Sequence, residues 1–429
     1  MSSPAVPAQR WVRIIPVAFL MYTIAFIDRN NIAFGFFGMQ KDLGIAATAS
    51  GLAAGIFFFG YLFLQVPGAW LAEKWSAKRF ITLSLLVWGC VSMMTALAQN
   101  LTQLLVIRFA LGFVEGGVSP ATMILLTKWF PLSERSRANA LWYLCIPAAS
   151  MITGPVSGWI LTHYDWRTLF LLEGAPAVIW AIVWWLLVDD SPRDASWISA
   201  AERDYLEVTI AAEKKAIKAE TPSIREVLHN RNVVLLLVLF CFLQVGFYGY
   251  GLWLPTLVKA LSQGTMMQVG WITAIPWACA MVGSVLLSMR ADKTRDYKTY
   301  IAGPILLAAV FLTLSVLAGP NRPVLAIAAL SICMGFMYCY AVFWTALSAF
   351  IAEEVLAVAM GTINAIGNLG GFFGPFLVGY LIDRTGTVYA GEAMLIVFLV
   401  IAGLFALRLR NRQAPQLPAN AQTRTAAAG

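Results

Sequence analysis

Residues 14–39 read IIPVAFLMYTIAFIDRNNIAFGFFGM. About 20 helical residues cross the roughly 30 Å hydrocarbon core of a bilayer, so this apolar run is long enough to span one. It is interrupted at FIDRNN, residues 26–31, where Asp28 and Arg29 are charged and two asparagines follow. An ionisable side chain at membrane depth costs at least about 2.5–3.5 kcal/mol on insertion scales and tends to face a cavity or a partner. The stretch therefore predicts a membrane helix that brings charge to an interior site.

Apolar runs of similar length recur along the whole chain. Hydrophobic residues make up 60% of it and charged residues 12%, whereas a soluble domain is nearer half apolar and a quarter charged. The sequence lacks the short alternating segments of about 10 residues that are typical of transmembrane β-barrels. We therefore predict an all-α polytopic membrane protein.

The remaining composition argues against other classes of protein. The formal net charge is +8, but the basic residues cluster on one side of the predicted membrane, so we expect no nucleic-acid partner. The six cysteines fall in predicted spans without metal-ligand spacing, so we expect no disulfide, metal or other cofactor. His163 and His229 are the two histidines, both in loops. No catalytic triad or nucleotide loop is visible, so we expect no catalytic residues and no enzyme.

The spacing of the apolar runs predicts twelve transmembrane helices. They are placed at about residues 14–39, 51–71, 80–98, 101–127, 138–161, 168–188, 233–258, 269–289, 300–317, 324–350, 355–382 and 390–407. Alternate loops are rich in Lys and Arg, and the loops between them hold few: Lys41, Arg167, Lys259, Arg322 and Arg384. The positive-inside rule then places both termini in the cytoplasm.

Two landmarks repeat at nearly the same offset. Glu73 and Asp292, each in a charged loop after a span, lie 219 residues apart, and Gly154-Pro155 and Gly374-Pro375 lie 220 residues apart. Tandem six-span halves with a site between them at mid-membrane are a known transporter plan. We predict an N-terminal six-helix half at 1–188, a cytoplasmic linker at 189–232, a C-terminal six-helix half at 233–410 and a disordered cytoplasmic tail at 411–429. Ser199 and Glu202 have capping-box spacing, which predicts an amphipathic helix in the linker.

Four stretches resemble a known family over nearly the whole chain. They are FIDRNNIAF in the first span, RFALGFVEGGVSPATMILLTKWFPLSERSRANAL across the fourth span and its loop, LFLLEGAP in the sixth and MGTINAIGNLGGFFGP in the eleventh. The chain is similar to the major facilitator superfamily, and within it to the anion:cation symporters, bacterial carriers of the tartrate, galactonate, phthalate and hydroxyphenylacetate type. The superfamily's usual loop motif is only partly kept. Ala69 stands at its first glycine, Glu73 at its aspartate and Ser76 at its second glycine.

Depth estimates place the intramembrane charges in relation to one another. At 1.5 Å per residue, Asp28 and Arg108 lie about 9–10 Å from the outer edge of the core, and Glu115 lies about 10 Å deeper than Arg108. Arg29 and Arg108 therefore share a depth and are predicted to converge on one anion. Glu115 follows Arg108 by two helical turns on the same face. A carboxyl group in a poorly solvated site takes up a proton more readily, so we predict Asp28 and Glu115 to be proton-coupling residues.

Uncharged polar residues extend this predicted site. Gln244 lies at mid-depth in the seventh span, and Asn364 and Asn368 lie four residues apart on one face of the eleventh. Tyr61 is a predicted cavity wall. The resemblance implies substrate or proton roles for the residues at the family's site positions: Asp28, Arg29, Tyr61, Arg108, Glu115, Gln244 and Asn364.

Structural interpretations of the same residues stay open. Asp28 and Arg29 would neutralise each other, Arg108 and Glu115 would form static pairs between helices, and the amides would join helices by hydrogen bonds. We expect a structural role for Glu173, near Arg167 at the outer end of the sixth span. Glu353 and Glu354 fall in a cytoplasmic loop, where a solvated or gate-pairing role is expected.

The function expected from the sequence is secondary active transport in a bacterial inner membrane. A single chain would import an organic acid anion with protons, by alternating access between its halves. The alternative is a proton-driven exporter of drugs or metabolites, although the intramembrane arginines favour anionic cargo. A membrane enzyme is disfavoured by the lack of a catalytic set, and a sensor that does not transport is the remaining interpretation. The sequence does not identify the acid, the proton stoichiometry or the oligomeric state.

Overall fold

Helices provide the regular structure of residues 8–216 and 224–410, the part of the chain that the computed structural model describes. The first group comprises α1 (Gln9–Asn30), α2 (Ile32–Asp42), α3 (Ala47–Leu71), η1 (Ala72–Ser76), α4 (Ala77–Met94), η2 (Thr95–Leu97), α5 (Leu101–Gly116), α6 (Val118–Trp129), α7 (Leu132–Tyr143), α8 (Cys145–His163) and α9 (Trp166–Leu187). Two helices follow in the predicted linker, α10 (Ala200–Ala216) and α11 (Ile224–His229).

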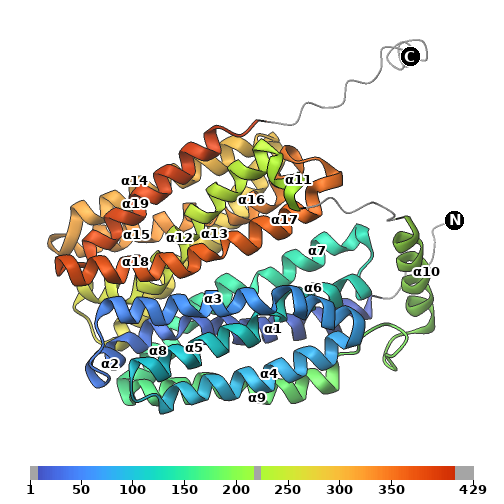
Figure 1. Cartoon of the computed structure of the whole chain (residues 1–429), viewed down its shortest axis with the longest axis horizontal. Coiled ribbons are helices and arrows are strands. Elements are labelled where there is room, and N and C mark those ends of the chain that lie inside the picture. Colours follow the sequence, from blue (N-terminus) through green and yellow to red (C-terminus); the bar gives the residue numbers. More distant parts are fainter. Residues whose placement is uncertain (1–7, 217–223, 411–429) are drawn as a thin grey trace, which may run out of the picture.

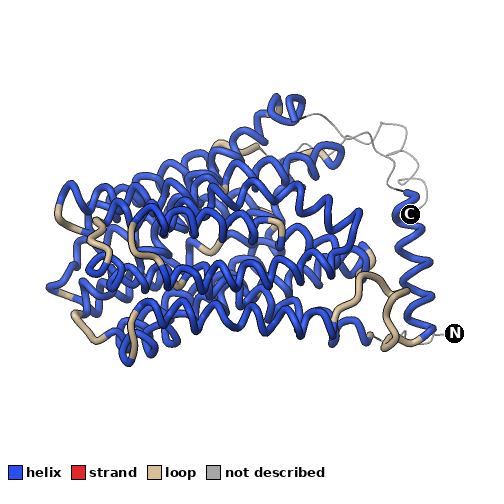
Figure 2. Tube along the Cα trace, turned by 60° about the horizontal axis from the view of Figure 1, so that its bottom comes forward, coloured by secondary structure: helices blue, strands red, loops and turns tan. Residues whose placement is uncertain are grey.

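The second group comprises α12 (Arg231–Ser262), α13 (Met266–Thr294), α14 (Tyr297–Ala318), η3 (Gly319–Asn321), α15 (Pro323–Met337), α16 (Tyr340–Phe350), α17 (Glu353–Gly367), α18 (Leu369–Thr385) and α19 (Val388–Leu407). In Figure 1, helices α1–α9 form the lower group and α12–α19 the upper group. The long helices run side by side, and α10 lies across one end of them in both views (Figures 1 and 2).

Eleven helical segments among the described residues are long and apolar enough to cross a membrane. One of them, Ala47–Leu97, is 51 residues long, about twice what a single crossing needs. It is interrupted at Ser76, whose backbone is extended (φ −173°, ψ 124°). The Ser76 hydroxyl accepts a hydrogen bond from the Arg79 amide, which caps the start of α4. The chain therefore turns between α3 and α4 although the apolar pattern runs on.

Several membrane-length segments are interrupted near their middle by one or two residues. The interruptions fall at Asn31 between α1 and α2, at Gly117 between α5 and α6, at Leu144 between α7 and α8, at Tyr338–Cys339 between α15 and α16, and at Asn368 between α17 and α18. Asn31, Gly117, Leu144 and Asn368 keep right-handed helical dihedral angles, so the chain continues in the same course through them. The backbone departs further from the helix at Tyr338–Cys339, where ψ is 24° and 4°.

The two groups of helices meet through close backbone contacts made by glycine. A Cβ added at Gly51 of α3 would lie 2.2 Å from the carbonyl oxygen of Pro375 in α18, and one at Gly154 of α8 would lie 2.4 Å from that of Gly270 in α13. Small residues let membrane helices approach this closely and pack by van der Waals contact. The pairs α3–α18 and α8–α13 thus join the groups.

The N-terminal segment and the linker helix are held together by a buried arginine. Arg10 donates to Glu202 of α10 at 2.5 Å and to Glu134 of α7 at 2.7 Å. The Glu202 amide donates to Ser199 Oγ at 3.3 Å, immediately before α10 begins. Residues 217–223 of the predicted linker and the predicted tail at 411–429 lie outside the described residues.

Gly112 provides a test of the contact between α3 and α5. A Cβ at this position would lie 1.9 Å from the carbonyl oxygen of Phe57, and overpacking of this kind typically costs about 1–3 kcal/mol. We expect Gly112→Ala to lower the unfolding midpoint of the detergent-solubilised protein. Gly303→Ala is the control because an added Cβ there meets nothing within 4 Å. Equal midpoints for the two variants would contradict the close contact.

Candidate functional site

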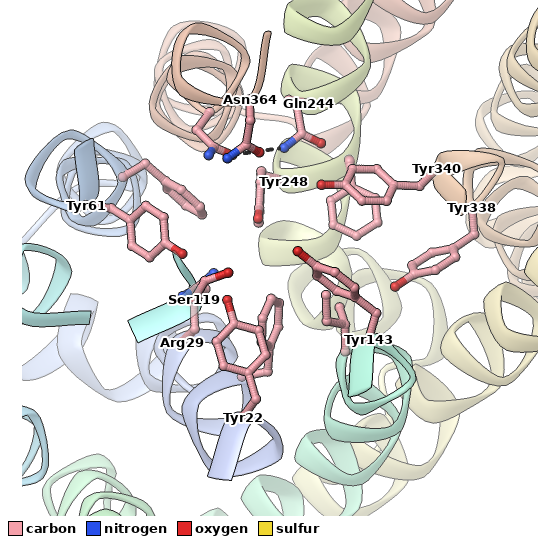
Figure 3. Close-up of a pocket in the computed structure, with 15 residues that line it drawn as sticks. Tyr22, Arg29, Tyr61, Ser119, Tyr143, Gln244, Tyr248, Tyr338, Tyr340 and Asn364 are labelled. Atoms are coloured by element: carbon pink, nitrogen blue, oxygen red, sulfur yellow. Dashed lines mark hydrogen bonds between the residues drawn. The ribbon is translucent and has the colours of Figure 1, made fainter. Parts of the chain in front are cut away.

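A cavity lies between the two groups of helices (Figure 3). Its walls come from α1, α3, α6, α7 and α8 on one side, and from α12, α16, α17 and the residues next to α15 and α18 on the other. The lining residues are Tyr22, Phe26, Arg29, Phe58, Tyr61, Ser119, Tyr143, Ile146, Gln244, Phe247, Tyr248, Tyr338, Tyr340, Asn364 and Asn368. Arg29 is the one charged residue among them.

The helix interruptions lie beside this cavity. Arg29 is two residues before the interruption at Asn31, and Tyr143 immediately precedes the one at Leu144. Tyr338 and Asn368 are themselves interruption residues. Several polar lining residues therefore lie within two residues of these interruptions.

Arg29 is held by a carboxylate and by aromatic rings. Its Nη2 donates to Glu115 Oε2 of α5 at 2.9 Å, and only 4% of the residue is exposed. The guanidinium carbon lies 4.5 Å from the ring centroid of Phe26, 5.0 Å from that of Phe57 and 4.9 Å from that of Tyr61. Cation–π contacts in a desolvated place contribute about 2 kcal/mol each. The rings thus fix the guanidinium at the cavity wall.

The ion pair leaves hydrogen-bonding capacity unused. Glu115 Oε1 and Arg29 Nε have no hydrogen-bond partner, although both are buried. Buried polar atoms without partners are rare and are costly in a low-dielectric interior. A proton on Glu115 or an anion against Arg29 would each use some of this capacity. The arrangement is therefore suited to exchanging partners.

Asp28 faces away from the cavity. It is fully buried and accepts hydrogen bonds from Trp88 Nε1 at 2.9 Å, from Asn31 Nδ2 at 3.2 Å and from the Ser92 hydroxyl. Successive residues on a helix point in different directions, so Asp28 and Arg29 lie on different faces of α1. Arg29 is paired with Glu115, whereas the donors to Asp28 are uncharged.

Arg108 lies behind the cavity wall. It is 1% exposed, its Nε donates to the Ala53 carbonyl oxygen at 3.4 Å, and one Nη atom has no partner. Its guanidinium carbon lies 5.2 Å from the centroid of the Phe57 ring, which Arg29 also contacts. The structure therefore places both predicted arginines around one ring but brings only Arg29 to the cavity lining.

The predicted amides line the opposite wall. Gln244 Nε2 donates to Asn368 Oδ1 at 3.3 Å, and Gln244 Oε1 has no partner. Asn364, one helical turn before Asn368, also lines the cavity (Figure 3). Tyr61 completes the set of predicted residues that the cavity brings together with Arg29. A bound molecule between the walls would meet a cation on one side and amides on the other.

Sequence reasoning missed five of the six tyrosines in the lining: Tyr22, Tyr143, Tyr248, Tyr338 and Tyr340. Figure 3 shows hydroxyl groups of the labelled tyrosines pointing into the cavity. Tyrosine in membrane helices is usually enriched at the two interfaces. Tyr248, Tyr338 and Tyr340 lie near the middle of predicted spans, and that position was the available signal.

Two other acidic sites are placed differently. Glu173 accepts a hydrogen bond from Ser157 Oγ at 2.8 Å, whereas Arg167 donates to the carbonyl oxygens of Ala96 and Ala98. The expected neighbour Arg167 is therefore engaged elsewhere. The side chains of Glu353 and Glu354 lie outside the described structure.

Comparison with known proteins shows which proteins the whole chain is similar to. The sequence profile described as Major Facilitator Superfamily matches residues 18–357 and 262–428. A putative tartrate transporter of Agrobacterium vitis is 34% identical over 411 residues, covering 94% of each chain. A quinolone resistance transporter of Acinetobacter baumannii is 33% identical over 407 residues, covering 92% of each chain.

Solved structures show the same architecture at low sequence identity. A bacterial homologue of the human lysosomal transporter Spinster, crystallised in an inward-facing and unoccupied conformation, superposes with a TM-score of 0.76 at 18% identity. The match covers 94% of this chain and 97% of that one. At this identity the likeness establishes the fold, which is all-helical as predicted.

Proposed function

Because the chain belongs to the Major Facilitator Superfamily, we propose that it imports a small organic acid anion together with protons. The relatives and the fold are those of multi-pass membrane transporters, and the predicted resemblance to tartrate-type carriers is confirmed. The proposed cargo is an organic acid anion, the proposed coupling ion is the proton, and the proposed direction of transport is into the cell. The observation that carries it is the single cationic side chain of the cavity, Arg29, paired with a carboxyl group.

We propose twelve membrane crossings with both termini in the cytoplasm. The extended backbone at Ser76 supports dividing Ala47–Leu97 into two crossings, which adds one to the eleven segments. The halves are 1–188 and 233–410, joined by the linker 189–232 and followed by the tail 411–429. The protein acts as a monomer in a bacterial inner membrane, and its halves rock around the cavity between them to give alternating access.

The ion pair offers a physical basis for coupling. While Glu115 is ionised it occupies the Arg29 guanidinium, so an entering carboxylate has to compete with it. A proton on Glu115 removes its charge and frees Arg29, whose planar fork of donors matches a substrate carboxylate. Proton and anion then bind together more favourably than either alone. A lone anion moving inward against 100 mV would be opposed by about 2.3 kcal/mol per charge, so accompanying protons also favour import.

The remaining lining residues suit a hydroxylated or aromatic acid. Amides of Gln244, Asn364 and Asn368 can hydrogen-bond substrate hydroxyls, and the tyrosines supply both hydroxyls and ring faces. Arg108 does not touch the cavity, and we propose that it acts on the anion through its field from behind Phe57. Asp28 is proposed as a second proton-coupling carboxyl group.

Export of a drug or metabolite is the alternative function. The quinolone resistance transporter is nearly as similar to this chain as the tartrate relative. The aromatic lining would also accept a flat ring compound. The two functions differ in the direction of net transport relative to the proton gradient.

Uptake by proteoliposomes tests the proposed function. The panel is labelled tartrate, galactonate, glucarate, phthalate and 4-hydroxyphenylacetate, each with and without an inward proton gradient. We expect one acid to accumulate severalfold more with the gradient, and a protonophore should abolish that excess. Gradient-driven movement of a quinolone in the opposite direction, with no acid accumulated, would favour the exporter.

Glu115→Gln tests the coupling role of the ion pair. The substitution removes the titrating group but keeps a hydrogen-bond acceptor for Arg29. We expect accumulation driven by the proton gradient to fall at least tenfold, and one-for-one exchange of substrate at equal pH to fall much less. Equal loss of both activities would contradict a proton role for Glu115.

Arg29→Gln and Arg108→Gln separate contact with substrate from an effect through the field. Hydrogen bonds to a charged group contribute about 1.5–3 kcal/mol, so we expect Arg29→Gln to weaken substrate binding roughly tenfold or more. Arg108→Gln should weaken it less, because Arg108 is not at the cavity lining. Binding is measured on purified protein by calorimetry. Equal losses would contradict a binding site centred on Arg29.

A further inference from the structure

Tyr338 and Tyr340 both line the cavity although they are only two residues apart. In a regular helix, residues two apart lie about 200° apart around the axis and do not face the same side. Here α15 ends at Met337 and α16 begins at Tyr340, and ψ is 24° at Tyr338 and 4° at Cys339. The break between the two helices therefore lets both tyrosines face one cavity.

Phe247 of α12 packs with these two tyrosines. Its ring centroid lies 5.8 Å from that of Tyr338 and 6.3 Å from that of Tyr340, and the two tyrosine centroids lie 6.4 Å apart. Aromatic rings attract one another at centroid separations of about 4.5–7 Å. All three side chains line the cavity, so Phe247, Tyr338 and Tyr340 form a ring cluster in its wall.

The ring cluster lies across the cavity from the cation. In Figure 3, Arg29 and the labelled tyrosines of the cluster lie on opposite sides of the cavity. The ring of Tyr248 connects the two sides, because its centroid lies 5.2 Å from that of Phe247 and 4.2 Å from that of Phe58 on α3. The cavity is thus charged at one end and aromatic at the other.

We propose that the cargo is an aromatic acid, whose ring binds against the ring cluster while its carboxylate pairs with Arg29. This inference rests on the proposed function and narrows its cargo. Protein rings pack well against a flat apolar ring. A sugar acid carries a hydroxyl group on nearly every carbon, and the ring faces of the cluster supply no hydrogen bonds to replace those made to water. The cluster therefore discriminates against sugar acids.

The Tyr338 hydroxyl offers a polar contact for a substituent on the bound ring. Tyr338 is 7% exposed, and in Figure 3 its hydroxyl points into the cavity. That hydroxyl has no hydrogen-bond partner in the part of the chain that the structure describes. A free hydroxyl can both donate and accept. We therefore expect Tyr338 to favour a ring that carries a hydroxyl group, as in 4-hydroxyphenylacetate.

Calorimetry on the purified wild type tests the class of cargo. Phenylacetate and cyclohexylacetate carry the same charge and are similar in size, but only the first has a flat aromatic ring. We expect phenylacetate to bind about fivefold more tightly than cyclohexylacetate. We also expect 4-hydroxyphenylacetate to bind about tenfold more tightly than galactonate, which has the same charge. Equal affinities within the first pair, or tighter binding of galactonate, would overturn the proposal.

Phe247→Leu tests whether the ring cluster causes this preference. Leucine keeps an apolar side chain but removes the ring, so we expect the ratio of phenylacetate to cyclohexylacetate affinity to fall toward one. Phe336→Leu is the control, because the Phe336 ring packs against Phe311 at 5.8 Å and lies outside the cavity lining. It should keep the wild-type ratio. Equal ratios in the two variants would contradict the proposal, and Tyr340→Leu replaces Phe247→Leu if that variant does not fold.

Tyr338→Phe tests the hydroxyl contact separately from the ring. We expect phenylacetate affinity to stay at the wild-type value, and the preference for 4-hydroxyphenylacetate over phenylacetate to fall toward one. Tyr300→Phe is the control because Tyr300 lies outside the cavity lining. An unchanged preference in Tyr338→Phe would overturn the role of its hydroxyl.

The further inference and the proposed function fail in different ways. If galactonate or tartrate is accumulated with the inward proton gradient, and aromatic acids bind no more tightly than these, the proposed function stands and the aromatic cargo is wrong. If aromatic acids bind through the ring cluster but no acid is accumulated with the gradient, the ring site stands and the proposed function is wrong.

Discussion

The ion pair between Arg29 and Glu115 is the constraint around which the interior is arranged. Two ions taken out of water are stabilised only when their geometry is good and their remaining hydrogen bonds are met. Here one bond of 2.9 Å joins them, rings of Phe26, Phe57 and Tyr61 surround the cation, and one atom on each side stays unpartnered. If this ion pair served only the stability of the fold, apolar side chains of similar volume would stabilise the fold equally well or better. An incompletely satisfied pair at a cavity wall is explained by a partner that comes and goes.

Close helix contacts position the cavity lining both within each group of helices and between the two groups. Gly112 lets α5 pack closely against the backbone of α3 at Phe57. The rings of Phe57 and Tyr61, both on α3, contact the guanidinium of Arg29. Contacts between the groups combine glycine, aromatic rings such as Phe58 against Tyr248 at 4.2 Å between centroids, and hydrogen bonds from Ala47 and Thr48 to Asp383 of α18. Alternating access, as proposed, would require these contacts to separate and re-form.

The sequence predicted the all-helical fold class but not which side chains pair at the site. Hydrophobic runs predict where a helix crosses a membrane, and the rise per residue estimates depth, which placed Arg29 and Arg108 toward the outer side and Gln244 at mid-depth. In the structure Arg29, Gln244 and Asn364 line one cavity. Which side chains meet depends on how each helix is rotated about its axis and shifted along it. A depth estimate that is wrong by one helical turn pairs a side chain with the wrong partner. The pairing of Arg29 with Glu115, and the position of Arg108 behind Phe57, therefore required the structure. The five tyrosines were missed because a hydropathy reading counts them with the apolar residues.

The adjacency of Asp28 and Arg29 in the sequence has a mechanical consequence. Arg29 points to the cavity, and Asp28 points to Asn31 and α4, so one turn of α1 touches both the proposed anion site and the proposed proton site. A change of charge on Asp28, as proposed, would alter its hydrogen bonds with Trp88, Ser92 and Asn31, and any movement of α1 that followed would carry Arg29 with it. Coupling between the proposed proton site and the proposed anion site needs no long pathway in this arrangement. Asp28 belongs to the first site, and Arg29, the next residue in the chain, belongs to the second.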